Sequence, residues 1–140
     1  MAVAAVASAG LSSEAEAAQS TETFFRTMSE THYEQLLATG RVPATAETFI
    51  SPSLEYASQY SGITVQLEVE AGTTDALLTI GVRNAGLTDE IYANLPLVQR
   101  GWTATSAFFK LEGDVVNIGL GRGTALDIFN SSLVNFGSIP

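Results

Sequence analysis

The sequence predicts an α+β domain in which two or three short helices come early and strands make up most of the rest. Apolar and polar residues alternate strictly over residues 63–70, which is typical of a strand with one buried face. Tyr33, Leu36 and Leu37 follow Ser29 at helical spacing, which indicates a short capped helix. The last third of the chain holds several closely spaced β-prone runs. Together these patterns favour a mixed or antiparallel sheet over a doubly wound parallel one.

The first half of the chain is expected to alternate strands with short helices. The elements expected there are a strand over 23–28, a helix capped by Ser29 and ended by Gly40, a short strand over 48–50 and a helix over 54–60 capped by Ser53. Pro43 and Pro52 interrupt the chain between these elements. The alternating strand over 63–70 then follows.

The second half is expected to be richer in strands. Its expected elements are a short helix capped by Thr74 and ended by Gly81, a long loop over 83–101, and strands over 102–111, 115–120, 125–129 and 133–139. Residues 112–114, Glu-Gly-Asp, form a tight turn between two of these strands. Long loops in small domains are often functional, so the loop over 83–101 is a candidate functional segment.

The 140 residues fit one domain with a single core. The Ala- and Ser-rich residues 1–20 are interpreted as a flexible tail or linker remnant, and residues 21–140 as a single domain. There is no cysteine, and His32 is the one histidine, so thiolate metal sites are excluded and no metal is expected.

The charge balance narrows the choice of partners. Six Lys and Arg stand against 15 Asp and Glu, which gives a net charge of −9. Nucleic acids and anionic membranes are attracted by clustered cations, so neither is expected as a partner. A basic protein surface is the better candidate, although acidity that only keeps the domain soluble explains the charge equally well.

Candidate site residues lie at the ends of predicted strands. Arg26 follows two phenylalanines, and its planar guanidinium could hold a diphosphate or a ribose edge, although an ordinary ion pair is the simpler interpretation. Ser51 could orient a ribose or cap the next helix. Trp102 could stack on a ring or pack in the core. The Gly-rich run over 119–123 fits no phosphate-loop spacing, which favours a β-turn or bulge.

Taken in order, several segments resemble the ADP-ribosyltransferase fold of bacterial polymorphic toxins, with its split mixed or antiparallel sheet. More narrowly, they look like the C-terminal toxin domains of Rhs-type proteins that modify elongation factor Tu. The segments that carry the resemblance are FRTMS (25–29), ETFISPS (47–53), GTTDAL (72–77), GWTATSAFFK (101–110) and NIGLG (117–121).

The resemblance implies a role for each of three strands. Arg26 takes the place of the arginine that binds NAD, and Ser51 that of the serine in the aromatic-x-Ser-Thr-Ser strand, where Pro52 departs from the usual threonine. Asn117 stands where the family carries its catalytic glutamate. An amide can hydrogen-bond a ribose but offers no full charge, so either Asn117 takes the catalytic role and the reaction relies less on charge, or Glu112 or Asp114 reaches in as the acid. Trp102 would contact the nicotinamide, and the loop over 83–101 would sit over the site and choose the acceptor.

The expected function is therefore that of an NAD-dependent mono-ADP-ribosyltransferase toxin. It would use NAD as co-substrate and modify a bacterial protein, with elongation factor Tu suspected, and thereby block translation. We expect a monomeric secreted effector that is delivered to the cytoplasm of a target bacterium and neutralised by a cognate immunity protein. Two alternatives stay open: an NAD glycohydrolase on the same fold, and a non-catalytic acidic domain that binds or inhibits a basic partner.

Overall fold

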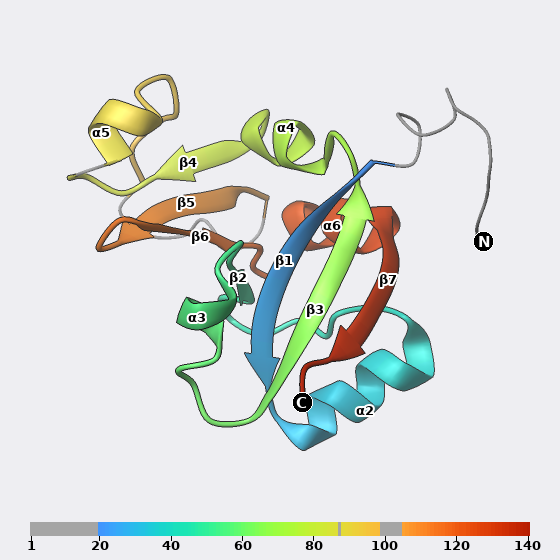
Figure 1. Ribbon diagram of the computed structural model, residues 1–140. Coiled ribbons are helices and arrows are strands. Elements are labelled where there is room, and N and C mark those ends of the chain that lie inside the picture. The colour runs from blue at the N-terminus through green and yellow to red at the C-terminus, as the bar shows by residue number, and fades with distance from the viewer. Residues whose placement is uncertain (1–19, 87, 99–104) are drawn as a thin grey trace.

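The chain folds into two β-sheets, shown by a computed structural model that describes residues 20–86, 88–98 and 105–140 (Figure 1). The first sheet is antiparallel and has the order β1 (Thr21–Met28), β3 (Ile63–Glu70), β7 (Leu133–Ser138). The second has the order β2 (Phe49–Ile50), β6 (Val115–Gly119), β5 (Ala107–Glu112), β4 (Gly81–Arg83). It is mixed, because β4 and β5 run parallel whereas its other pairs are antiparallel.

Short helices connect and cover these sheets. They are α2 (Glu30–Thr39), α3 (Leu54–Ala57), α4 (Thr73–Leu78), α5 (Thr88–Ile91) and α6 (Thr124–Ser132). The predicted α+β class, with mixed and antiparallel sheets and few short helices, is confirmed.

The alternation in β3 has the predicted consequence. Val65, Leu67 and Val69 are fully buried, whereas the residues between them are half-buried or exposed. The strand lies in the middle of its sheet, and Leu67 faces Phe24 of β1 across the antiparallel register. Hydrophobic burial of one face therefore fixes the register of this sheet.

Both predicted ends of α2 are confirmed. Ser29 Oγ accepts a hydrogen bond from the His32 backbone N–H at 3.1 Å, which satisfies one of the free donors of the first turn. Gly40 ends the helix at φ 71°, and its N–H donates to the Leu36 carbonyl at 2.8 Å. A left-handed backbone of this kind suits glycine because it has no Cβ.

The cap predicted for α4 is wrong. Gly72 occupies the N-cap position and offers no side chain, and Thr74 is inside the helix. The Glu22 carboxylate of β1 caps the helix instead, accepting from the backbone N–H groups of Gly72 and Thr74 at 2.9 Å each. A negative charge at a helix N-terminus also interacts favourably with the helix dipole. Since Glu22 lies about fifty residues earlier in the chain, local sequence could not reveal this cap.

The strand predicted over 125–129 is also wrong, because these residues belong to α6. The buried residues Ala125, Leu126, Phe129 and Asn130 lie on one face of a helix. The preceding Gly-rich segment is a turn, as expected, with Gly121 at φ 63°. The Gly121 N–H donates to the Glu47 carbonyl at 2.9 Å, so it is engaged within the protein.

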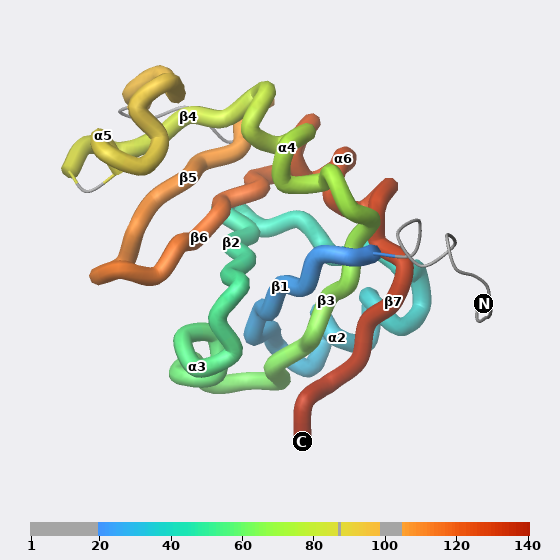
Figure 2. Tube along the Cα trace, turned by 45° about the horizontal axis from the view of Figure 1, so that its top comes forward, coloured from blue at the N-terminus to red at the C-terminus, as the bar shows by residue number. Residues whose placement is uncertain are grey.

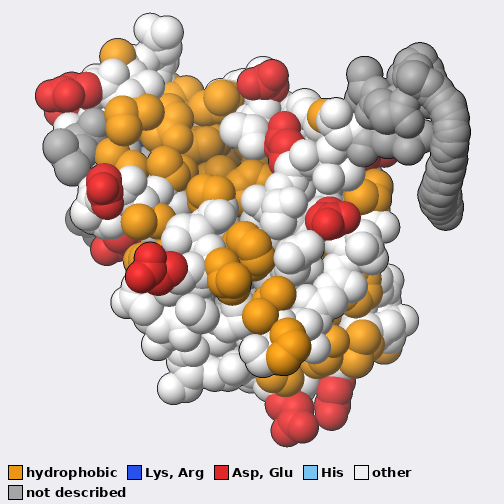
Figure 3. Space-filling view, viewed as in Figure 1, with side chains coloured by type: hydrophobic (Ala, Val, Ile, Leu, Met, Phe, Trp, Pro, Cys, Tyr) orange, Lys and Arg blue, Asp and Glu red, His pale blue; other side chains and the backbone are white. Residues whose placement is uncertain are grey.

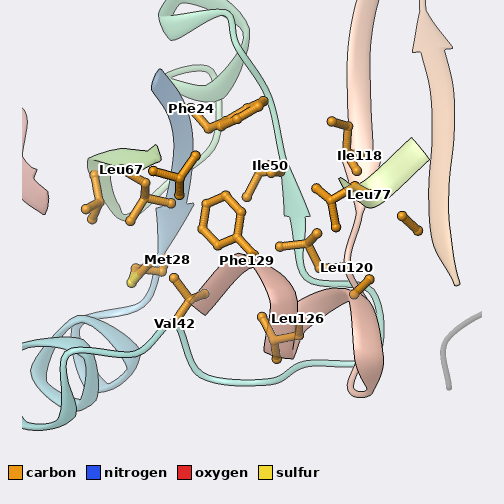
Figure 4. Packing of buried hydrophobic residues seen from close by; sticks show 14 of the residues in the cluster. Phe24, Met28, Val42, Ile50, Leu67, Leu77, Ile118, Leu120, Leu126 and Phe129 are labelled. Atoms are coloured by element: carbon orange, nitrogen blue, oxygen red, sulfur yellow. The ribbon is translucent and has the colours of Figure 1, made fainter. Parts of the chain in front are cut away.

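Helix α6 packs where the two sheets approach each other (Figure 2). Phe129 lies at the centre of the core, with Leu67 and Phe24 toward one sheet and Ile50 toward the other (Figure 4). The Phe24 and Phe129 rings meet edge to face, with centroids 6.0 Å apart. One helix therefore joins both sheets into a single core.

Asn130 on the same helix holds a loop to the core. Its Oδ1 accepts from the Val42 N–H at 2.8 Å, and its Nδ2 donates to the Val42 carbonyl at 3.1 Å. We expect Asn130→Ala to destabilise the protein by roughly 2–4 kcal/mol, because both buried backbone groups of Val42 lose their partners. Urea denaturation would measure this change. Asn94→Ala, at an exposed loop position, is the matched control, and an equal loss in both variants would contradict the assignment.

Candidate functional site

A pocket of about 450 Å³ lies where the two sheets diverge. The backbone groups of Phe25 and Ser51 exchange hydrogen bonds of 2.7 and 3.0 Å, and this short bridge joins β1 to the segment after β2. Beyond the bridge the sheets separate, and side chains from β1, β2, α3, β5 and β6 line the space between them. Four of the predicted site residues, far apart in the sequence, line this one pocket: Arg26, Ser51, Glu112 and Asn117.

Arg26 projects from β1 as a largely buried cation. Its Nη1 donates to the Phe49 carbonyl at 2.7 Å, and burial lowers the pKa of its guanidinium. Among the described residues, the cations that form ion pairs are Arg41, Arg83 and Lys110, and Arg26 forms none. The interpretation of Arg26 as a member of an ordinary ion pair therefore does not hold for these residues. Burying a guanidinium without a carboxylate partner lowers the stability of the fold. Its remaining N–H groups are suited to an anionic ligand.

Ser51 uses its hydroxyl inside the protein. Its Oγ donates to the Val116 carbonyl at 3.2 Å and accepts from the Ser53 N–H at 3.1 Å, and the residue is 2% exposed. These contacts fasten the end of β2 to β6 and lead into α3. Ser53 caps α3, as predicted, by accepting from the Tyr56 N–H at 3.1 Å. Ser51 therefore shapes the pocket wall, and its hydroxyl already has both partners.

Asn117 presents an unsatisfied donor to the pocket. It lies on β6 opposite Lys110 of β5, and it is 2% exposed. Its Nδ2 makes no hydrogen bond with any of the described residues. Buried polar groups nearly always have partners, so an exception in a pocket is evidence for a ligand that supplies the missing acceptor.

Glu112 brings a carboxylate to the rim of the pocket. It ends β5, its side chain is 43% exposed, and its Oε2 lies 2.8 Å from Lys110 Nζ. Lys110 Nζ also lies 4.5 Å from the centre of the Phe49 ring, a cation–π contact that holds it along the same wall. Asp114 is exposed in the following turn and does not line the pocket. Between the two acids that the sequence left open, the geometry favours Glu112. Trp102 lies outside the described residues.

Sequence reasoning missed two tyrosines at this site. Tyr56 of α3 and Tyr60 line the pocket, their hydroxyls are 2.8 Å apart, and their rings meet edge to face with centroids 5.7 Å apart. Both tyrosines lie in the segment 54–60 that was predicted as a helix, four residues apart, and Tyr60 is 57% exposed. Two aromatic residues one turn apart could have marked this wall.

A comparison with models of protein families assigns the chain to a family. A family model described as the PT3 toxin domain matches residues 20–138, which is most of the sequence. The chain belongs to the PT3 toxin domain family. It is thus a toxin domain of the polymorphic type, as the sequence suggested in its broader form. A search of the curated proteins found no match to it.

None of the described helices is both long and apolar enough to cross a membrane. Over the same residues, no three His, Cys, Asp or Glu side chains gather in a way that could hold a metal ion.

The described part of the 83–101 loop does not cover the pocket of the toxin domain. Tyr92 packs on Phe109, with ring centroids 5.1 Å apart. Phe109 and Lys110 are neighbours on β5 and point to opposite faces of the sheet, and Lys110 is the one that lines the pocket. The expectation that this loop sits over the site is therefore wrong for residues 83–86 and 88–98.

That loop instead forms a second, apolar groove with α4. Hydrophobic side chains gather over β4, α4 and α5, while acidic side chains are spread over the same face (Figure 3). The groove is lined by Leu78, Ile91, Tyr92 and Leu95 with small and polar neighbours. No charged side chain of the described residues lines it, unlike the pocket with Arg26. The pocket at the divergence of the sheets is therefore the better candidate for chemistry on a charged ligand.

Tyr56 provides a pH-dependent property of the toxin domain that can be measured. Burial first, and then the hydrogen bond to Tyr60, raise the pKa of Tyr56 from 10.0 to about 12. The charge of Glu112 adds to this increase, whereas the side chain of Asn117 opposes it. The folded protein thus keeps this proton to higher pH than the unfolded chain does.

We expect the free energy of unfolding to fall as the pH rises from about 10 to about 12, because only the unfolded chain loses the Tyr56 proton in that range. Urea denaturation at several pH values would measure the decline, and Tyr56→Phe should show a shallower one. Tyr33→Phe, on α2, serves as the control. Identical pH profiles for wild type and Tyr56→Phe would contradict the assignment.

Proposed function

We propose that this toxin domain is an NAD-dependent mono-ADP-ribosyltransferase that modifies a bacterial protein. The observation that carries the proposal is the pocket, which gathers a largely buried guanidinium and an amide donor, neither satisfied by an acidic partner or an acceptor, respectively, among the described residues, and a carboxylate. The three groups come from β1, β6 and β5, and they complement a ligand with an anionic diphosphate and ribose hydroxyls. Membership of a toxin domain family supports an activity that harms a target cell.

In the proposed reaction each side chain has a separate task. Arg26 binds the diphosphate and fixes the position of NAD. An acceptor side chain attacks the anomeric carbon of the nicotinamide ribose, and the C–N bond breaks so that its electron pair leaves with neutral nicotinamide. The acceptor proton passes to solvent. Positive charge develops on the sugar during this step, and the carboxylate of Glu112 would stabilise it electrostatically.

The acceptor is proposed to be a translation protein, with elongation factor Tu as the first candidate. The net charge of −9 favours an acceptor with a basic docking surface, since opposite charges accelerate encounter. The same acidity would suit a basic immunity protein. We propose that the domain acts as a monomer, as a secreted effector in the cytoplasm of a target bacterium.

Incubation with NAD labelled in its adenylate portion tests the proposal. The domain is mixed with NAD and a bacterial lysate, or with purified elongation factor Tu, and both labelled protein and free nicotinamide are measured. The proposal expects both products. Nicotinamide without labelled protein would indicate that water is the acceptor and would make the domain a glycohydrolase. If neither product forms, the enzyme proposal fails, and a salt-sensitive complex with a basic protein would become the alternative to seek.

A further inference from the structure

The unsatisfied amide of Asn117 has a polar neighbour that the proposed reaction has not yet used. Asn117 and Tyr56 both line the pocket, and the Asn117 amide faces the Tyr56 oxygen as a donor, which lowers the pKa of that hydroxyl, although the two atoms do not reach hydrogen-bonding geometry. The amide Nδ2 has no protein acceptor among the described residues. A ligand oxygen at this point would meet two donors at once.

Tyr56 is held firmly enough to act as a fixed donor. Helix α3 is capped by Ser53, and the Thr27 hydroxyl of β1 donates to the Ala57 carbonyl at 2.6 Å. Tyr60 lies one turn on, with its hydroxyl 2.8 Å from that of Tyr56, and either oxygen can donate. Without a ligand Tyr56 donates to Tyr60, which raises its pKa; when a ligand accepts the Tyr56 proton, Tyr60 can donate to the Tyr56 oxygen instead.

We propose that the Tyr56 hydroxyl and the Asn117 amide together bind one hydroxyl group of the nicotinamide ribose. This inference rests on the proposed function. A ribose hydroxyl has two lone pairs and one proton, so it can accept from both donors and donate to a carboxylate. Glu112 lines the same pocket, and we assign its carboxylate as the acceptor of the hydrogen bond that the ribose hydroxyl donates.

In this arrangement three side chains share two tasks that a single carboxylate could perform: orienting the ribose and supplying negative charge near it. Asn117 and Tyr56 orient the sugar, and Glu112 supplies the negative charge. A tyrosine suits the orienting task because it donates a hydrogen bond without bringing a positive charge that would cancel that of Glu112. A tyrosine hydroxyl also keeps its proton throughout the physiological range, so it remains a donor there.

A comparison of two proteins with three ligands tests the assignment. The dissociation constants of wild type and Tyr56→Phe are measured by calorimetry for NAD and for analogues that lack the 2′- or the 3′-hydroxyl of the nicotinamide ribose. We expect Tyr56→Phe to weaken NAD binding about tenfold and to leave unchanged the binding of the analogue that lacks the contacted hydroxyl. Replacing Tyr56 and removing the ribose hydroxyl from NAD abolish the same hydrogen bond, so the losses of affinity from these two changes should not add.

Tyr60→Phe and Tyr33→Phe complete the set. Tyr60→Phe should weaken NAD binding about threefold, because Tyr56 is then less well held, and Tyr33→Phe should have no effect. Equal loss for all three ligands, or no loss with Tyr56→Phe, would overturn the inference while wild type still binds NAD and releases nicotinamide. If wild type neither binds NAD nor releases nicotinamide, the proposed function itself is overturned and this inference with it.

Discussion

Replacing Arg26 with methionine is expected to lower NAD binding and nicotinamide release at least about a hundredfold, while the protein stays folded. The guanidinium can make two parallel charge-assisted hydrogen bonds to a diphosphate, which together are worth roughly 3 kcal/mol or more. Arg26→Lys is the informative companion. It keeps the charge but loses the planar fork, so we expect it to recover only part of the lost binding.

The stability of Arg26→Met separates a binding role from a structural one. The buried guanidinium has no carboxylate among the described residues, and its Nη1 makes the hydrogen bond to the Phe49 carbonyl. Removing the charge relieves desolvation, and removing the donor loses that bond, so the net change should be within about 1 kcal/mol. Thermal unfolding measures it. A large loss of stability together with unchanged NAD binding would show that Arg26 is there only for the fold.

How far the sequence predicts the fold depends on whether the stabilising contacts are local. The alternation in β3 and the caps Ser29, Gly40 and Ser53 depend on residues a few positions apart, and all are found in the structure. The α4 cap depends on Glu22 of a distant strand, which no local pattern contains. Helix α6 was mistaken for a strand because its short apolar run fits either period, and only its packing against both sheets selects the helix.

The candidate site follows a similar rule. The grouping of Arg26, Ser51 and the strand of Asn117 was expected from a resemblance, and the structure brings these residues to one pocket. Composition and spacing alone could not have predicted this grouping, because the pocket lies where the bridge between Phe25 and Ser51 ends and the two sheets separate. Tyr56 was overlooked because a tyrosine on a short helix is usually explained by packing.

The position of the pocket also explains how the fold tolerates its unpaired groups. Side chains at the divergence of two sheets are shielded from water by both, yet neither sheet supplies all their hydrogen-bond partners. Arg26 is largely buried there without an ion pair among the described residues, and the Asn117 Nδ2 is buried without an acceptor among them. Proteins accept such costs mainly at functional sites, where a ligand later satisfies the free groups.

Glu112→Gln is expected to lower the rate of nicotinamide release about a hundredfold with little change in the Michaelis constant for NAD. Glutamine keeps the size and the hydrogen-bonding oxygen but removes the charge, so it affects the transition state, in which the sugar becomes positive, more than the bound substrate. The ion pair with Lys110 is partly exposed, and pairs of this kind contribute about 0–1 kcal/mol, so the melting temperature should hardly change.

Asp114→Asn is the matched control, because it removes the same charge two residues away in an exposed turn outside the pocket. If the proximity of the carboxylate to the sugar matters, Asp114→Asn should retain wild-type rates. Equal losses in the two variants would mean that the overall acidity of the domain, rather than a placed carboxylate, supports the reaction. Raising the salt concentration distinguishes these cases further, since screening weakens a distant charge more than one within contact of the substrate.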